Sequence, residues 1–231
     1  TALDTLVQTV SEPVRGQDWL HQFEPRIGVA VKADADTSTA EQVIGIDNFT
    51  PYYSLDLKHA RVAHLAARYG DLFTFKDVDF GDANALAQAL DGVKIDRIVH
   101  LGAQPGVRYS LENPAANIHS NVAGHVNILE LARHRTIAHL VYASSSSVYG
   151  DKPMGGEGFK EEEPANDPVS LYAATKRACE LMSQSYAKLY GFPQTGLRFF
   201  TVYGPWGRPD MAYFSFTQKI LKGEAIEVYG D

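Results

Sequence analysis

A tyrosine and a lysine stand four residues apart in this chain, at Tyr172 and Lys176. On a helix, side chains at positions i and i+4 lie one above the other, so an ammonium group can hold its charge beside a phenol and favour the phenolate. A phenolate held in this way can act as a general base. A serine run, Ser144 to Ser147, precedes the pair and can offer hydroxyl groups to the same site. The spacing predicts a proton-transfer centre, provided that the surrounding elements bring these residues together.

Each of these residues also has a simpler interpretation. In a chain with 12 tyrosines, a tyrosine four residues before a lysine can arise by chance. Tyr172 could then be a half-buried helix residue, Lys176 a solvated charge and the serines part of a turn. The neighbouring elements and motifs decide between the two interpretations.

Apolar runs of strand length alternate along the chain with amphipathic stretches of helix length. The central runs are apolar enough to be buried on both faces, as strands of a parallel sheet are. Pro114 suits the first turn of a helix, and Gly191 suits the residue after the end of one. We expect strands at Val43 to Ile46, Leu72 to Phe75, Arg97 to Leu101, His139 to Ala143 and Gly196 to Phe200, and helices at Leu55 to Arg68, Ala83 to Leu90, Pro114 to Arg133 and Leu171 to Leu189.

This alternation predicts an α/β fold built on a doubly wound parallel sheet. Ligands of such sheets bind at the carboxyl ends of the strands. The serine run directly follows one predicted strand, and Asp47 ends another. We therefore expect both to lie at the ligand-binding edge of the sheet.

Composition limits the class of protein. With 231 residues, 45% of them hydrophobic, the chain can bury a sizeable core. The formal net charge of -7 argues against a nucleic-acid surface, and neither the histidines nor the run Glu161 to Glu163 has metal-ligand spacing. The single cysteine, Cys179, the lack of a membrane-spanning apolar run and the lack of a signal-peptide pattern predict a soluble cytoplasmic protein.

Five short motifs follow one another in order and at suitable spacing. They are DN at 47–48, LGAQ at 101–104, SSSSVYG at 144–150, YAATK at 172–176 and RFFTVYGP at 198–205. Together they resemble the extended short-chain dehydrogenase/reductase family, in its branch of NAD-dependent nucleotide-sugar epimerases and dehydratases. The stretches VRYSLENP at 107–114 and DNFTPYY at 47–53 are most similar to UDP-glucuronate 4-epimerases. The resemblance covers about residues 43–231 and implies a Rossmann-like fold.

The resemblance implies specific catalytic roles for Tyr172 and Lys176. Tyr172 would take the proton from the sugar 4-hydroxyl while the C4 hydride passes to NAD, which gives a 4-keto sugar that turns over and receives the hydride on its other face. Lys176 would favour the phenolate and also hydrogen-bond the nicotinamide ribose. Ser145 matches the family's residue that hydrogen-bonds the same sugar hydroxyl.

The residues after Ser145 separate the possible reactions. Sugar 4,6-dehydratases that resemble this chain carry Asp-Glu where Ser146 and Ser147 stand, and UDP-xylose synthases keep the glutamate. Serine has no group that exchanges a proton near neutral pH, so dehydration and decarboxylation are disfavoured. These hydroxyls and that of Thr201 can instead donate to a substrate carboxylate. The guanidinium groups of Arg208 and Arg108 would bind the uronate or the diphosphate, although Arg108 could equally be a surface arginine.

The cofactor contacts follow from the same resemblance. Asp47 can accept hydrogen bonds from the adenosine ribose hydroxyls, and an acid at this place disfavours the 2′-phosphate of NADP, so NAD is expected. Asp79 matches an adenine contact, although it could belong to an ordinary turn. The other implied cofactor contacts are Asn48, Phe80, Leu101, Gly102, Ala103, Gln104, Asn121, Tyr172, Lys176 and Phe199.

One expected element is missing from the N-terminal sequence. A Rossmann fold needs a glycine-rich turn at a helix N-terminus for the pyrophosphate, about 20 residues before the acid that ends the second strand. Residues 1–42 contain only Gly16 and Gly28, and the apolar run Ile27 to Val31 leads into a polar stretch too short for the expected helix. We interpret 1–42 as an atypical segment that arose from a shifted reading frame, a misjoined gene or a replacement. Residues 43–205 would form the NAD-binding domain, and 206–231 would begin a truncated substrate-binding region.

The sequence therefore predicts an isomerase, a NAD-dependent nucleotide-sugar 4-epimerase that acts on UDP-glucuronate. Two alternatives stay open: a non-catalytic fragment or binding module of the same fold, and an epimerase of the UDP-glucose/galactose type. A homodimer formed through the two long helices is the expected assembly. Neither nucleic acid nor a membrane is an expected partner.

Overall fold

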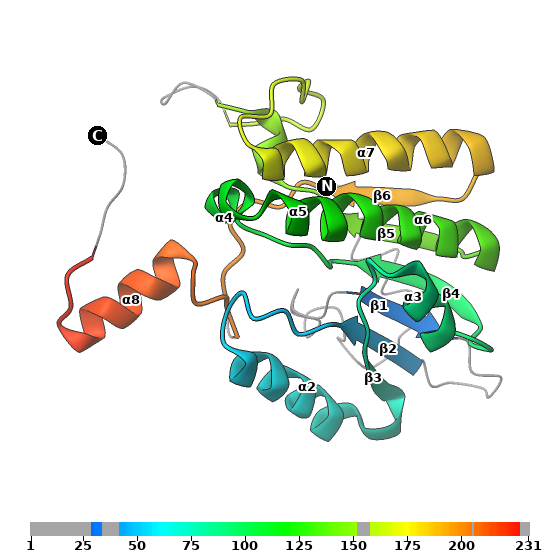
Figure 1. The fold of residues 1–231 in the computed structure, drawn as a ribbon, viewed down its shortest axis with the longest axis horizontal. Coiled ribbons are helices and arrows are strands. Elements are labelled where there is room, and N and C mark those ends of the chain that lie inside the picture. The colour runs from blue at the N-terminus through cyan, green and yellow to red at the C-terminus, as the bar shows by residue number, and fades with distance from the viewer. Residues whose placement is uncertain (1–28, 34–41, 152–157, 205, 227–231) are drawn as a thin grey trace.

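The sheet places its strands in the order expected of a Rossmann-like fold. The computed structural model describes residues 29–33, 42–151, 158–204 and 206–226, the first of these ranges by its backbone. Six strands lie in the order β3-β2-β1-β4-β5-β6 (Figure 1). They are β1 (Val29–Ala33), β2 (Gln42–Asp47), β3 (Phe73–Asp77), β4 (Ile95–His100), β5 (His139–Ala143) and β6 (Gln194–Leu197).

Three strand pairs are parallel, as the sequence predicts: β2 with β3, β4 with β5, and β5 with β6. The central strand, β1, is antiparallel to both of its neighbours. Because β2 and β4 are each antiparallel to β1, they run in the same direction as one another. The carboxyl ends of β2 to β6 therefore lie at a single edge of the sheet.

The atypical N-terminal segment contributes β1, which runs in the direction opposite to that of its neighbours. Val29 pairs with Ile46 and His100, near the carboxyl ends of β2 and β4. The last residue of β1, Ala33, pairs instead with Gln42 at the start of β2. The chain thus leaves β1 at the amino edge of the sheet, whereas a pyrophosphate-binding turn must follow the first strand at the carboxyl edge.

Helices cover the sheet on both sides. α3 packs against α6 and α6 against α7, while α2 lies across the sheet from them (Figure 1). None of the described helices combines the length and the apolar character that crossing a membrane takes. The helices are α2 (Leu55–Tyr69), α3 (Ala83–Ala89), α4 (Val107–Glu112), α5 (Pro114–Asn117), α6 (Gly124–Arg135), α7 (Leu171–Tyr190) and α8 (Ala212–Lys222), with short turns η1 (Gly70–Leu72), η2 (Ile118–Ala123) and η3 (Ser146–Tyr149).

Local sequence fixes the ends of α7, the helix that carries Tyr172 and Lys176. Ser170 caps its start by accepting a hydrogen bond from the amide of Ala173 at 3.0 Å. Gly191 ends it at a φ of 75°, which glycine adopts at low cost, and its amide bonds the carbonyl of Ala187. The predicted helix is confirmed with nearly the expected bounds, so the pair lies one turn apart on a regular helix.

The long helix predicted from Pro114 to Arg133 is also present, but it is not uniform. Pro114 stands in the first turn of α5, where its missing amide costs nothing, and Asn113 caps that turn. The backbone then passes through one π-helical stretch, η2, before α6 continues to Arg135. Two further helices, α4 and α8, were not among those expected from the sequence.

The core lies between the sheet and the helices α3 and α6. Ile46, Ile98 and Leu140 from three strands are fully buried, as are Ile128 and Leu129 from α6. Burial of such side chains is the main source of stability for a fold of this kind. The strands whose carboxyl ends carry the predicted site residues are therefore packed into the hydrophobic core.

Candidate active site

A pocket of about 440 Å³ opens at the carboxyl ends of the parallel strands. The loops after β2, β4, β5 and β6 contribute to its wall, together with the first turns of α7. Most of the residues predicted from the sequence meet there. They are Asp47, Asn48, Phe80, Leu101, Gly102, Ala103, Gln104, Ser145, Ser146, Ser147, Tyr172, Lys176, Phe199, Thr201 and Arg208.

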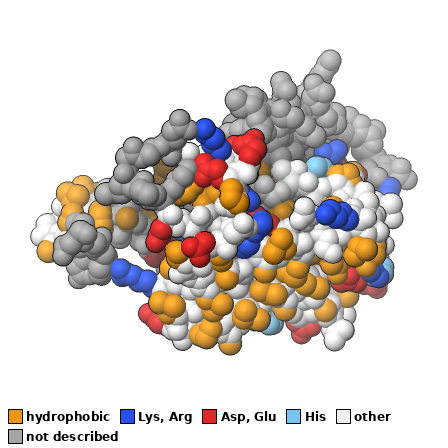
Figure 2. Space-filling view, turned by 90° about the horizontal axis from the view of Figure 1, so that it is seen from above, with side chains coloured by type: hydrophobic (Ala, Val, Ile, Leu, Met, Phe, Trp, Pro, Cys, Tyr) orange, Lys and Arg blue, Asp and Glu red, His pale blue; other side chains and the backbone are white. Residues whose placement is uncertain are grey.

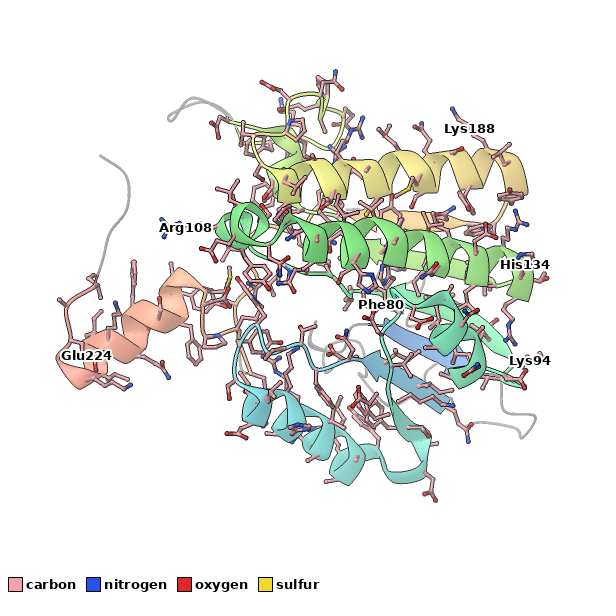
Figure 3. The ribbon with its side chains drawn as sticks, in the orientation of Figure 1. Phe80, Lys94, Arg108, His134, Lys188 and Glu224 are labelled. Atoms are coloured by element: carbon pink, nitrogen blue, oxygen red, sulfur yellow. The ribbon has the colours of Figure 1, made fainter. Side chains whose placement is uncertain are left out.

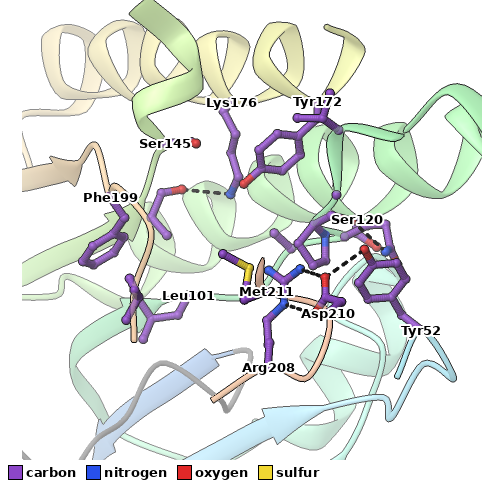
Figure 4. A pocket seen from close by; sticks show the side chains of 18 of the residues that line it. Tyr52, Leu101, Ser120, Ser145, Tyr172, Lys176, Phe199, Arg208, Asp210 and Met211 are labelled. Carbon is purple, nitrogen blue, oxygen red and sulfur yellow. Dashed lines mark hydrogen bonds and ion pairs between the residues drawn. The ribbon is translucent and has the colours of Figure 1, made fainter. Parts of the chain in front are cut away.

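The Tyr172 and Lys176 side chains both reach from α7 into this pocket (Figure 4). Tyr172 is half-buried, and Lys176 is only 3% exposed. The Lys176 ammonium donates a hydrogen bond to the carbonyl of Ala143, the last residue of β5, at 2.9 Å. This bond uses one of three ammonium N–H groups and fixes the charge beside the pocket. The interpretation of Lys176 as a solvated surface charge is therefore wrong.

The serine run forms a tight turn at the end of β5. Ser145 caps η3 by accepting a hydrogen bond from the Ser147 amide at 3.2 Å, and its hydroxyl lies 3.2 Å from that of Ser147. Ser144 donates instead to a carboxylate oxygen of Glu180 at 2.6 Å. The turn that the simpler interpretation proposed does exist, and Ser145, Ser146 and Ser147 line the pocket.

Glu180 anchors the serine turn to α7. Its carboxylate accepts hydrogen bonds from Arg198 at 2.8 Å and Arg177 at 2.7 Å in addition to Ser144. Burial opposes the charged form, but the hydrogen bonds from Arg198, Ser144 and Arg177 hold the pKa of Glu180 below its ordinary value. Because Glu180 stands one turn after Lys176, this cluster fixes the serines relative to the helix that carries the predicted base.

Asp47 ends β2 at the opposite side of the pocket. One of its carboxylate oxygens accepts a hydrogen bond from the Phe49 amide at 2.8 Å and lies 3.6 Å from the ammonium of Lys58. Lys58 is 7% exposed, and burial lowers its pKa while the charge of Asp47 opposes that shift. Among the residues that the structure describes, no hydrogen bond is made to its second carboxylate oxygen, and Asp47 lines the pocket.

Sequence reasoning missed several residues of the pocket wall. One signal was available: Lys58 and Arg61 stand three residues apart on α2, and both are buried on its inner face. Charged side chains at the inner positions of an amphipathic helix point to a site or a built-in ion pair. The missed lining residues include Thr50, Tyr52, Tyr53, Lys58, Ser120, Asp210 and Met211.

Asn121 does not line the pocket but supports its wall. It is buried in η2, where its side-chain oxygen accepts from the Gln104 amide at 2.8 Å. Its side-chain nitrogen faces the Gln104 carbonyl at 3.1 Å and the hydroxyl of Thr175 at 3.0 Å. Thr175 lies between Tyr172 and Lys176 on α7. Asn121 therefore ties the loop after β4 to the helix that bears the pair.

Two other predicted residues also lie outside the lining. The Asp79 carboxylate accepts from the Gly81 amide at 2.7 Å and lies 3.0 Å from the imidazole of His119. This geometry matches the turn that was the alternative interpretation of Asp79. Arg108 is exposed on α4, with its side chain directed away from the body of the molecule (Figure 3).

Two buried histidines stand behind the wall near Lys176. The rings of His100 and His125 stack with centroids 5.4 Å apart, and His125 lies 2.8 Å from the Ser183 hydroxyl. Burial, and then the charge of Lys176, lowers the pKa of His125 to about 3. Burial also holds the pKa of His100 well below its ordinary value. Both rings are therefore neutral at physiological pH and add no charge beside Lys176.

Comparison with known proteins shows the family to which this chain belongs. The profile of the NAD dependent epimerase/dehydratase family matches residues 27–231. The chain belongs to this family. Among curated relatives of this family member, UDP-glucuronate 4-epimerase 1 of Arabidopsis thaliana is 50% identical over 188 residues, which cover 81% of this chain and 43% of that protein. Protein CapI of Staphylococcus aureus is 48% identical over 187 residues, which cover 81% of this chain and 54% of that protein.

Solved structures of the same fold resemble this epimerase/dehydratase family member closely. A mutant UDP-glucuronic acid 4-epimerase from Bacillus cereus, in complex with NAD and UDP-4-deoxy-4-fluoro-glucuronic acid, superposes with a TM-score of 0.73 at 31% identity and covers 81% of this chain and 57% of that one. A dTDP-glucose 4,6-dehydratase from Streptomyces venezuelae, with NAD bound, gives a TM-score of 0.73 at 29% identity over 84% of this chain and 57% of that one. The chain spans about half the length of the curated relatives it matches.

Proposed function

We propose that this chain carries the catalytic residues of a NAD-dependent nucleotide-sugar 4-epimerase that acts on UDP-glucuronate. The observation that supports this most directly is the meeting of Tyr172, Lys176 and three serine hydroxyls in one pocket. That arrangement offers a base, a fixed positive charge and neutral donors. It offers no acid at either position after Ser145.

Tyr172 acts as the proton carrier. As C4 of the sugar is oxidised, the phenolate oxygen takes the proton of the 4-hydroxyl, and it returns that proton when C4 is reduced on the other face. The Lys176 ammonium favours the phenolate, and the Ser145 hydroxyl orients the sugar oxygen. NAD, when bound, supplies the acceptor for the C4 hydride. The proton and the hydride both return to the sugar, so the reaction has no net redox change.

The substrate is assigned from the donors that face it. Ser146, Ser147 and Thr201 line the pocket with hydroxyls that can donate to a carboxylate at C5 of the sugar. Neither serine can remove a proton from C5 near neutral pH, so the same wall disfavours dehydration. The relatives of similar sequence that are named UDP-glucuronate 4-epimerases support a uronate over a neutral sugar.

The pocket fits two parts of NAD. Asp47 can accept hydrogen bonds from the adenosine ribose hydroxyls, and Phe80 and Gly102 also line the pocket. Lys176 can donate to the nicotinamide ribose, and Phe199 lines the pocket close to the serine turn. Asp79 lies outside the pocket lining, 3.0 Å from His119. The NAD phosphates need backbone donors at the carboxyl edge of the sheet, whereas β1 ends at the amino edge, where Ala33 pairs with Gln42.

The reversed β1 favours one alternative function. A chain that keeps the pocket but lacks the pyrophosphate-binding turn would bind the nucleotide sugar without turning it over. The absorbance of the purified protein after denaturation separates the two cases, because copurified NAD supports the enzyme. An empty protein that also fails to bind added NAD supports the binding module.

Product analysis tests the reaction itself. The purified chain with NAD and UDP-glucuronate is expected to form the C4 epimer, and Tyr172→Phe is expected to slow this by about a hundredfold or more, because it removes the general base. Tyr69→Phe, on α2 and outside the pocket, is the matched control. An unchanged rate in Tyr172→Phe would refute the assignment of the base. A product released with loss of carbon dioxide or water would refute the assignment of the reaction.

We also propose that the chain forms a homodimer through its two long helices. Figure 2 shows hydrophobic side chains on the face of the molecule seen from above. Leu111 on α4 and Leu181 and Leu189 on α7 are 74%, 51% and 69% exposed. Exposed apolar side chains on neighbouring helices are typical of an interface. A cytoplasmic location is part of the same proposal and rests on the single, buried Cys179.

A further inference from the structure

Arg208 is held in a fixed direction by a neighbouring acid. Its Nε donates to one carboxylate oxygen of Asp210 at 3.0 Å, and its Nη2 donates to the other at 2.5 Å. Paired bonds of this kind fix the plane of a guanidinium as well as its position. Both side chains line the pocket, with 27% of Arg208 and 33% of Asp210 exposed (Figure 4).

The pairing leaves part of the guanidinium available to a ligand. The bonds to Asp210 use the edge formed by Nε and Nη2, and Nη1 has no partner among the residues that the structure describes. Burial disfavours the charge of Arg208, but the bonds and charge of Asp210 keep its pKa above its ordinary value, with smaller contributions from Tyr52 and then Tyr172. Arg208 is thus a preformed cation on the Tyr172 side of the pocket.

Tyr52 connects this pair to the cofactor side of the pocket. Its hydroxyl donates at 3.2 Å to the Asp210 oxygen that also accepts from Nη2 of Arg208. Its ring lies under the Arg208 guanidinium, with 5.7 Å between the guanidinium carbon and the ring centre. Burial and the Asp210 charge raise the pKa of Tyr52, so its hydroxyl stays a donor. The Tyr52 hydroxyl also lies against Gly106, where an added Cβ would stand 2.5 Å away.

These contacts join segments far apart in sequence. Tyr52 lies in the loop between β2 and α2, where Asp47 ends the strand, whereas Arg208 and Asp210 precede α8. A second link supports the first: Arg61 on α2 donates to the carbonyl of Trp206 at 2.6 Å. The segment that carries Arg208 is therefore fastened to the cofactor side at two points.

We propose that Asp210 is a positioning residue, which presents the free edge of the Arg208 guanidinium to an anionic group of the nucleotide sugar; this inference rests on the function proposed above. Asp210 does not touch the ligand. It orients the cation before the ligand arrives, so that binding does not have to order a flexible arginine. The free Nη1 edge is suited to one oxygen of a phosphate or a carboxylate.

Affinity measurements with graded probes test the proposal. The purified full chain is titrated with uridine, UDP and UDP-glucuronate, in the wild type and in Asp210→Asn. Loss of one well-placed charge-assisted bond corresponds to about a tenfold loss of affinity for the anionic probes. The affinity for uridine, which has no anionic group, is expected to stay within about twofold of the wild type on the same ground. Tyr52→Phe is expected to act in the same direction with a smaller effect, and the exposed Asp91→Asn serves as the matched control.

The double variant shows whether Asp210 acts through Arg208. In an Arg208→Gln background, Asp210→Asn is expected to change the affinity for UDP-glucuronate by less than about twofold, because its target is gone. A merely structural role would weaken all three probes and would persist in that background. Equal or tighter binding of UDP-glucuronate by Asp210→Asn would overturn the inference and leave the proposed function intact. A wild-type chain that binds none of the probes would overturn the proposed function and this inference with it.

Discussion

Asn121 lies behind the pocket wall, and its replacement by leucine should lower the free energy of unfolding. The side chain is 1% exposed and satisfies both backbone groups of Gln104, at 2.8 and 3.1 Å. Leucine has the same branched shape but no polar side-chain atoms. A buried backbone group left without a partner costs about 1–3 kcal/mol, so the two groups together cost about 2–6 kcal/mol. The apolar surface that leucine adds offsets about 1 kcal/mol of this.

Urea denaturation measures the effect. We expect the free energy of unfolding of Asn121→Leu to fall by about 3 kcal/mol at an unchanged m-value, because the surface exposed on unfolding stays the same. Asn84→Leu is the matched control, since Asn84 is exposed on α3 and its replacement should matter by less than about 0.5 kcal/mol. Equal unfolding free energies in the two variants would refute the view that Asn121 holds the Gln104 loop.

Two further predictions concern stability. For His125, the unfolded chain takes up a proton near pH 6.5, whereas the folded chain does so only near pH 3, so folding stability should fall as pH drops between these values, by up to about 1.4 kcal/mol per pH unit. His125→Phe should flatten this slope in unfolding measurements from pH 6 to 4, and an unaltered slope would contradict the burial of a neutral ring. Gly106→Ala should lower the unfolding free energy by about 1–3 kcal/mol, because its φ is 103° and the new Cβ would meet the Tyr52 hydroxyl. Gly92→Ala, with a φ of 68° and open space around it, isolates the backbone cost, and an equal loss in both variants would rule out the contact with Tyr52.

Local signals in the sequence were enough to place the helix that carries the predicted base and the edge of the sheet. Ser170 and Gly191 bound α7, and the four-residue spacing on that helix sets Tyr172 above Lys176. The strand that ends at Ala143 places the serines at the same edge. Each of these predictions depends only on residues close together in the sequence, because helix caps, helical spacing and strand ends are set by local backbone geometry.

Contacts across the chain were beyond the reach of the sequence. Asp210 meets Tyr52 over a separation of 158 residues, and no spacing rule relates the two. Asn121 was predicted from the family as a cofactor contact, whereas its hydrogen bonds to the loop at Gln104, made from a π-helical stretch, were not predicted. A side chain's direction there depends on one extra residue in a turn, which composition does not indicate.

The direction of β1 could not be predicted either. A short apolar run satisfies a buried strand position equally well in both directions, because its side chains alternate with the same period from either end. The antiparallel pairing with β2 and β4 completes the backbone hydrogen bonds of both strands.

The reversed β1 has a consequence for the fate of such a chain in a cell. A central strand fills the gap between β2 and β4 in either direction, whereas only one direction delivers a turn to the bound cofactor. Proteases and chaperones act on exposed apolar surface and unpaired strands, and here β1 leaves neither of its neighbours unpaired. We therefore expect a chain with this N-terminal segment to persist as folded protein. The effect of its reversed first strand should appear as weaker binding of the cofactor and not as degradation of a misfolded chain.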